Sequence, residues 1–303
     1  MLNDDLKPVC NSRVPIDKLP VWRLFELRND CDVLEIDFQD SELHGSLSRA
    51  FLELPSLQKL ILTGTGVSGH LAVLANSSEL VDLQLRDLDV AGDLKELERA
   101  AKIKTLDLCG TKTMGNLKAL EKAVDLVALL LSQAQVAGDL ETLQNAVELK
   151  SLDLSDTEVA GDIKALQKAT KLENLALAGT RISGSLKALK NASGLIQLDL
   201  SEIEITGDVK ALESATKLEN LYLPSTNIFG DLQALKNAKA LIELDLSETK
   251  ITGDLKALEN ATELENLYLA ETDISGDMAS LPYAKHLQDM DISGSEIQGQ
   301  QGC

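Results

Sequence analysis

A single unit of 23 residues recurs along most of this chain, and no other feature of the sequence restricts its fold as strongly. A first, degenerate copy begins at Val33 and is one residue longer, so we count twelve repeats, of which the last ends early. Leucine or isoleucine marks each later copy, without an insertion, at Leu57, Leu80, Ile103, Leu126, Leu149, Leu172, Leu195, Leu218, Leu241, Leu264 and Leu287. Self-similarity at this period is typical of a solenoid, in which stacked repeats bury one continuous core.

Each unit contains two different periodicities. In "LENLYLAET" (residues 264–272) leucines alternate with Asn266, Tyr268 and Ala270, the period of two expected of a β-strand. We expect the leucines to face the core and the other side chains to face outwards. In "GDLKALENA" (residues 253–261) apolar residues stand three apart, which predicts a short helical or 3₁₀ turn with Asp254 as its N-cap.

A threonine and then a glycine recur at fixed positions after the predicted strands. The threonines are Thr65, Thr111, Thr157, Thr180, Thr226, Thr249 and Thr272, and Leu88, Ala134 and Ile203 replace them in three repeats. A stacked column of hydroxyls is expected to hydrogen-bond the backbone of neighbouring turns, which otherwise lacks partners. The glycine that follows fits a tight backbone bend.

Over roughly residues 33–299 this pattern resembles the leucine-rich repeat family, most closely the plant-type subclass with its L-x-G element. Threonine replaces the usual ladder asparagine, the subclass proline is missing, and the 23-residue unit is one residue shorter. The resemblance implies an α/β solenoid, a horseshoe with a parallel β-sheet on its concave face and short helical, 3₁₀ or irregular convex segments. In the plant-type subclass the element around the glycine forms a second short strand.

The ends of the chain lie outside the regular pattern. Residues 1–32 do not repeat and contain the apolar Trp22 and Phe25, so we expect an N-terminal cap, with a docking motif as the alternative. Residues 33–303 then form the solenoid. The resemblance also suggests a disulfide between Cys10 and Cys31, as in extracellular relatives. The last repeat stops at "SGSEIQGQQGC", so a missing tail or a partner is expected to cover the final coil.

The charge of the chain narrows the choice of partners. Lys and Arg number 29 against 49 Asp and Glu, a net charge of −20. This disfavours nucleic acid and anionic lipid and favours a basic protein or peptide. No apolar run reaches the ~18–20 residues of a membrane helix, and the residues after Met1 are acidic where a signal peptide is basic. We therefore expect a soluble intracellular protein, in the cytoplasm or an organelle lumen, with secretion left open.

The central outward position of the strand alternates between repeats. From residue 107 to residue 291 aspartate returns every 46 residues, and tyrosine stands between the last three aspartates. Duplication of a two-repeat unit explains the alternation. Tyrosines are frequent interface anchors, and carboxylates around them favour a Lys- or Arg-bearing partner. The candidate partner-binding residues are Asp199, Tyr222, Asp245, Tyr268 and Asp291, with the neighbouring column Asn220, Glu243, Asn266 and Asp289.

Two other interpretations of these surfaces stay open. The column is equally consistent with a solvated acidic face that carries two incidental tyrosines. In the N-terminal half, the corresponding outward positions suggest a more apolar patch. Its residues are Ile61, Val81, Val127, Ala128 and Leu130.

Residues for catalysis or metal binding do not form a recognisable set. The histidines His44, His70 and His286 are scattered and match neither a catalytic triad nor a zinc site. Alternate aspartates of the column are about 9.6 Å apart, too far to share calcium at ~2.4 Å from each. We therefore expect no enzyme, no metal and no cofactor.

The function predicted from the sequence is a non-catalytic scaffold or adaptor for protein–protein interaction, which binds its partner on the acidic concave face. One alternative is a constitutive structural subunit of a larger assembly. The other is a secreted or receptor-type recognition module, for which glycan on the sequons at Asn191 or Asn260 would argue.

Overall fold

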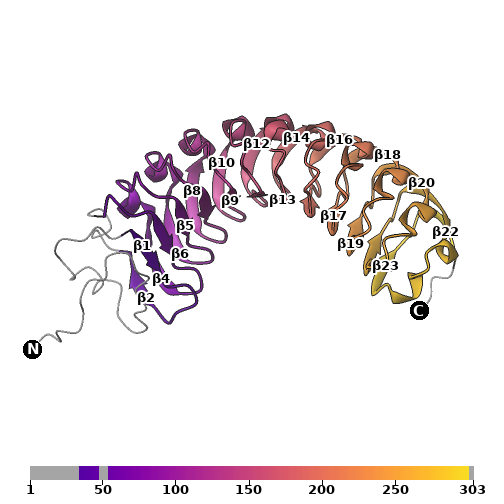
Figure 1. Ribbon diagram of the computed structural model, residues 1–303, viewed down its shortest axis with the longest axis horizontal. Coiled ribbons are helices and arrows are strands. Elements are labelled where there is room, and N and C mark those ends of the chain that lie inside the picture. The colour runs from indigo at the N-terminus through magenta and orange to yellow at the C-terminus, as the bar shows by residue number, and fades with distance from the viewer. Residues whose placement is uncertain (1–33, 48–53, 300–303) are drawn as a thin grey trace, which may run out of the picture. The chain divides into compact units, whose positions relative to one another are not determined.

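The structure is a computed structural model that describes residues 34–47 and 54–299. The predicted cap of residues 1–32 and the suggested pairing of Cys10 with Cys31 lie outside the described residues. The chain divides into two compact units, Met1–Gly138 (unit 1) and Asp139–Cys303 (unit 2). Each unit is a stack of similar coils with a short first strand and a second strand, and 3₁₀ helices follow from β4 (Gly66–His70) to β22 (Asp273–Asp277) (Figure 1).

The first strand of every repeat has three residues, and within each unit these strands pair in parallel and in chain order, as predicted. In unit 1 they are β1 (Glu35–Asp37), β3 (Lys59–Ile61), β5 (Asp82–Gln84), β7 (Thr105–Asp107) and β9 (Ala128–Leu130). In unit 2 they are β11 (Ser151–Asp153), β13 (Asn174–Ala176), β15 (Gln197–Asp199), β17 (Asn220–Tyr222), β19 (Glu243–Asp245), β21 (Asn266–Tyr268) and β23 (Asp289–Asp291). The central residue of these strands is buried in almost every repeat, and its two neighbours face outwards.

A second parallel sheet follows from the residues around the repeat glycine. In unit 1 its strands are β2 (His44–Ser46), β4 (Gly66–His70), β6 (Asp89–Asp93) and β8 (Lys112–Asn116), and β10 (Gln135–Asp139) ends at the boundary between the units. In unit 2 they are β12 (Glu158–Asp162), β14 (Arg181–Ser185), β16 (Glu204–Asp208), β18 (Asn227–Asp231), β20 (Lys250–Asp254), β22 (Asp273–Asp277) and β24 (Glu296–Gln298). The second strand implied by the resemblance is therefore present.

Short 3₁₀ helices close the coils, as the three-residue apolar spacing predicts. In unit 1 they are η3 (Leu71–Leu74), η4 (Leu94–Leu97) and η5 (Leu117–Leu120). In unit 2 they are η6 (Leu140–Leu143), η7 (Ile163–Lys168), η8 (Leu186–Leu189), η9 (Val209–Leu212), η10 (Leu232–Leu235), η11 (Leu255–Leu258), η12 (Met278–Ser280) and η13 (Ala284–His286). The predicted cap is confirmed at η11, where Asp254 Oδ1 accepts the backbone N–H of Lys256 at 2.8 Å.

The core is a stack of equivalent leucines. On β19, Leu244 is completely buried, and its register partners are Leu221 on one side and Leu267 on the other. Both partners are also completely buried. Each interior repeat is therefore stabilised mainly by its two neighbours, since a single coil has no second layer against which to bury these side chains.

The repeat glycine does more than permit a bend. Gly253 has a φ of +112°, and a Cβ placed there would lie 2.5 Å from Oδ1 of Asp231, the N-cap of η10 in the preceding repeat. Gly276 stands in the same relation to Asp254, at 2.7 Å. The glycine of one coil thus provides the space in which the capping carboxylate of the previous coil lies.

The threonine hydroxyls bond within their own turns, so the prediction that they bond neighbouring turns is wrong. Thr249 Oγ1 donates to the carbonyl oxygen of Leu246 at 2.7 Å, three residues earlier in the chain. One of the two residues between them, Glu248, has a left-handed φ of +56°, which reverses the chain and brings the hydroxyl back over that carbonyl. Where the hydroxyl is missing, the apolar Ile203 is buried instead, at 3% exposure.

Replacing Thr249 with valine is expected to lower the free energy of unfolding by about 1 kcal/mol, because the buried Leu246 carbonyl then loses a hydrogen bond. The measurement is urea denaturation followed by circular dichroism. Thr262, an exposed residue, provides the control, and Thr262→Val is expected to change stability little. Equal stabilities of the two variants would show that the turn hydroxyl contributes nothing.

Candidate partner-binding face

The register of the first sheet places the predicted site residues side by side in unit 2. Across β15, β17, β19, β21 and β23 the central column runs Asp199, Tyr222, Asp245, Tyr268, Asp291. The neighbouring column runs Asn220, Glu243, Asn266, Asp289 on the last four of these strands. We call these nine side chains the acidic face. Their placement follows from the constant repeat length, because each residue lies beside the residue 23 positions away on the neighbouring strand.

Hydrogen bonds tie the two columns together. The hydroxyl of Tyr222 donates to Glu243 Oε2, and the hydroxyl of Tyr268 donates to Asp289 Oδ2 at 2.8 Å. In both cases the tyrosine extends to a carboxylate on the next strand. Asn266 Nδ2 also donates to Glu243 Oε1, at 3.2 Å. The tyrosine rings are therefore held at both ends, by the backbone and by the bonded hydroxyl.

The aspartates of the central column have a structural task that the sequence analysis did not identify. Asp245 Oδ1 accepts the backbone N–H of Ser247 at 2.9 Å, and Asp199 and Asp291 do the same for the residues two positions on, at 3.0 and 2.9 Å. The signal was the serine two residues after each aspartate. In the intervening repeat Pro224 occupies that position and has no N–H to satisfy. The second oxygen, Oδ2, has no hydrogen-bond partner among the described residues at Asp199 and Asp245, whereas Asp291 also accepts a hydrogen bond from the side chain of Ser293.

These contacts change the acidity of the groups. Burial, together with the carboxylate of Glu243, raises the pKa of Tyr222 well above its ordinary value. The hydrogen bond to Asp289 raises the pKa of Tyr268. The backbone N–H of Ser293 lowers the pKa of Asp291, because it stabilises the charged form of that carboxyl group. Tyr222 and Tyr268 thus stay protonated and act as hydrogen-bond donors.

An alkaline titration tests these tyrosines. Because the folded-state pKa of Tyr222 lies above the ordinary 10.0, its contribution to stability is complete below pH 10 and is lost as the pH rises further. The absorbance of tyrosinate at 295 nm is expected to be small for the native protein at pH 10 and much larger in urea. Tyr222→Phe is expected to reduce the alkaline loss of stability. Half-ionised tyrosines in the native protein at pH 10 would contradict the geometry.

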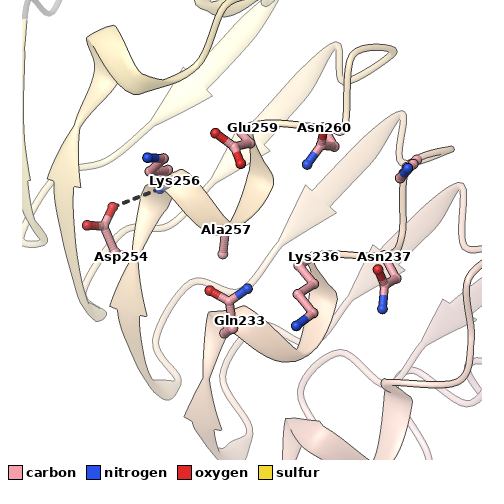
Figure 2. A pocket seen from close by; sticks show the side chains of 9 residues that line it. Gln233, Lys236, Asn237, Asp254, Lys256, Ala257, Glu259 and Asn260 are labelled. Atoms are coloured by element: carbon pink, nitrogen blue, oxygen red, sulfur yellow. Dashed lines mark hydrogen bonds between the residues drawn. The ribbon is translucent and has the colours of Figure 1, made fainter.

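The acidic face carries no cation to balance its charge. From Ser151 to Ser293 the three outward positions of every first-sheet repeat contain neither lysine nor arginine. Several lysines of unit 2, among them Lys236 and Lys256, lie instead at the 3₁₀ helices. Figure 2 shows one polar groove there, between η10 and η11, to which Lys236, Lys239 and Lys256 contribute. This groove differs from the acidic face, because its lysines stand beside the carboxylates of Asp254 and Glu259.

The same columns in unit 1 are different. Lys59 Nζ lies 3.2 Å from Asp37 Oδ2, and Arg86 Nε lies 2.9 Å from Asp107 Oδ2. These carboxylates are thus paired within the chain. The predicted apolar patch is also smaller than expected, because Ile61 is only 5% exposed. Its other four members are half-buried.

Other kinds of site were sought in residues 34–47 and 54–299. There we find no group of three or more His, Cys, Asp or Glu side chains arranged to hold a metal ion. His70 has a structural place: its Nδ1 accepts the backbone N–H of Ala72 at 3.2 Å and caps η3. No helix in this part of the chain has the length and apolarity needed to cross a membrane.

Comparison with known proteins defines the fold. Neither protein-family models nor curated proteins give a match to this chain. Among solved structures, the ectodomain of the Arabidopsis receptor kinase HAESA, in complex with an extended IDA peptide hormone, superposes with a TM-score of 0.76 at 24% identity, over 88% of this chain and 46% of that one. The plant peptide hormone receptor RGFR1 in complex with RGF2 gives 0.69 at 22% identity, over 88% and 52%.

A bacterial structure agrees with the plant ones. The leucine-rich repeat protein LIC12759 of Leptospira interrogans superposes with a TM-score of 0.63 at 19% identity, over 88% of this chain and 68% of that one. The chain thus spans about half the length of the two plant structures. At these identities the shared property is the fold, and the chain has the leucine-rich repeat fold.

Proposed function

We propose that the chain is a non-catalytic scaffold or adaptor that binds a protein or peptide with basic residues on its acidic face. The observation that carries this proposal is the absence of internal charge compensation there. Asp199, Glu243, Asp245, Asp289 and Asp291 make no ion pair with any described residue. A basic partner would neutralise them, and electrostatic attraction would speed its association.

The tyrosines supply the second part of a recognition surface. Tyr222 and Tyr268 are half-buried, and their hydroxyls are already bonded to carboxylates of the face. Their rings therefore offer apolar contact area, and because the side chains are already ordered, little conformational entropy is lost on binding. The face thus combines hydrogen-bond acceptors of fixed orientation, the carboxylates, with tyrosine rings of fixed orientation, a combination suited to binding a partner.

The structural comparisons support this choice. HAESA and RGFR1, whose ectodomains share the fold, are described as receptors in complex with peptide hormones. The second sheet also supports the plant-type subclass, because each described repeat contains the extra strand that this subclass has. The alternative of a structural subunit in a larger assembly would use the same acidic face for a permanent neighbour.

A second candidate function is extracellular recognition, which the receptor ectodomains among the similar structures favour over our expectation of an intracellular protein. The sequon asparagines Asn76, Asn191 and Asn260 are all exposed beside the 3₁₀ helices and lie outside the acidic face. Mass spectrometry of the protein purified from its natural source tests this candidate. Glycan at these asparagines on the native protein from its source supports it, and unmodified asparagines there would favour the intracellular location.

The proposed function is tested by affinity capture from source extracts with three baits. They are the wild type, the face variant Tyr222→Ala/Tyr268→Ala, and the control Lys236→Ala/Lys256→Ala in the polar groove of Figure 2. We expect partners that bind the wild type and the control but are lost from the face variant, with equal circular dichroism for all three. Retention of the same partners by the face variant would place binding elsewhere.

A further inference from the structure

We infer that the partner segment is a polyproline-II-like stretch with a basic residue at every third position, laid across the strands of the acidic face. This inference rests on the proposed function and names the kind of partner. Three observations carry it: the spacing of the aspartates, the orientation of their carboxylates, and the tyrosines between them.

The three aspartates form equally spaced positions for a cationic side chain, which we call stations. Asp199, Asp245 and Asp291 stand on β15, β19 and β23, so each is two strands from the next. Parallel strands lie roughly 4.8 Å apart, which places the stations at intervals of about 9.6 Å. A bound segment that follows the column must therefore present its cationic side chains on one face at this interval.

Only some backbone conformations meet that requirement. Polyproline II has three residues per turn and a rise of about 3.1 Å, so every third side chain shares a face at about 9.3 Å. An extended strand repeats a face every ~6.7 Å. An α-helix repeats it over seven residues at about 10.5 Å and would be out of step by about 2 Å at the third station. Polyproline II fits all three stations best.

The carboxylates are oriented in advance for such a ligand. In each station Oδ1 is held by the backbone N–H two residues on, as Ser247 holds Asp245 at 2.9 Å. At Asp199 and Asp245 the remaining oxygen, Oδ2, has no partner among the described residues and can accept from a guanidinium or ammonium group. Since the side chain is already fixed, little conformational freedom is lost when a cation binds.

The tyrosines fit the residues between the cations. Tyr222 lies in register between Asp199 and Asp245, and Tyr268 lies between Asp245 and Asp291. Aromatic side chains are the usual platforms for proline-rich polyproline II segments. The two residues between successive basic residues would therefore be proline or small apolar residues that pack on the rings.

Labelled peptides of identical composition test the inference. One contains three Arg-Pro-Pro triplets, the second has its three arginines at alternate positions, and the third has them adjacent. Fluorescence anisotropy with the full chain at about 0.15 M salt compares their affinities. We expect the triplet peptide to bind about tenfold more tightly than the others, on the order of a few exposed ion pairs with aromatic packing.

Variants locate the binding and separate the possible failures. Asp245→Asn keeps an oxygen for the turn and removes the charge, so it is expected to fold and to weaken the triplet peptide at least threefold. Asp273→Asn, an exposed carboxylate on β22, is the control. If the three peptides bind with equal affinity and Asp245→Asn abolishes this binding, the predicted three-residue spacing of the ligand is wrong. The proposed function would still hold. Absence of binding by every peptide would overturn both the inference and the basic character of the partner.

Discussion

Replacing Gly253 with alanine is expected to lower the free energy of unfolding by about 2–4 kcal/mol, among the largest single effects in this chain. The φ of +112° at this position strains any residue with a Cβ. The new atom would also lie 2.5 Å from Asp231 Oδ1, so the cap of η10 must move. Urea denaturation of the full chain, followed by circular dichroism, measures the loss.

Two further variants separate the causes. Thr252→Ser, at the exposed neighbour on β20, keeps the hydroxyl that donates to the Gly230 carbonyl oxygen and is expected to change stability by less than about 0.5 kcal/mol. In the double variant Asp231→Ala/Gly253→Ala the clash with the carboxylate is gone, so the total loss should be smaller than the sum of the single losses. A Gly253→Ala protein as stable as the wild type would show that the backbone adapts freely and that the glycine is dispensable.

Replacing Leu244 with alanine is expected to cost about 3–4 kcal/mol, because it leaves a cavity in a close-packed column. Leu244 is completely buried between Leu221 and Leu267, so the cavity weakens two interfaces between repeats at once. We expect a lower urea midpoint and a broader transition, since the coils on either side of the cavity would unfold with less coupling.

The matched control lies at the same position in the last described repeat. Met290 has Leu267 as its register partner on one side and is only half-buried. Met290→Ala is therefore expected to cost about half as much as Leu244→Ala, in line with its lower burial. Equal losses for the two variants would contradict the nearest-neighbour view of this stack.

Much of the fold could be predicted from the sequence because the repeat length is constant. With 23 residues in every unit, Asp245 must face Tyr222 and Tyr268 once the strands pair in parallel. The alternation of leucine with polar residues identified the first strand, and the three-residue spacing identified the 3₁₀ turns. The second sheet came from the resemblance alone, since residues such as Ile251 and Gly253 show no alternation that would announce a strand.

What the sequence did not reveal depends on backbone angles within the turns. The left-handed Glu248 sends the hydroxyl of Thr249 to its own turn, and nothing in the residue types announces that glutamate adopts this conformation. The same applies to Asp245, whose bond to Ser247 gives it a structural task as well as a charge. The side-by-side placement of these residues could therefore be predicted, whereas the internal bonds that orient them needed the structure.

The packing of each capping carboxylate against the glycine of the next repeat affects how the chain can gain or lose repeats during evolution. In each contact between successive repeats, one repeat provides the capping carboxylate and the next provides the glycine, as with Asp231 and Gly253. Whole units can therefore be gained or lost by recombination without leaving an unmatched junction, whereas a one-residue insertion would separate cap from glycine. Because aspartate and tyrosine alternate, exchange of 46-residue pairs would lengthen or shorten the acidic face in whole steps. The alternation of aspartate and tyrosine would continue unbroken in the longer or shorter chain.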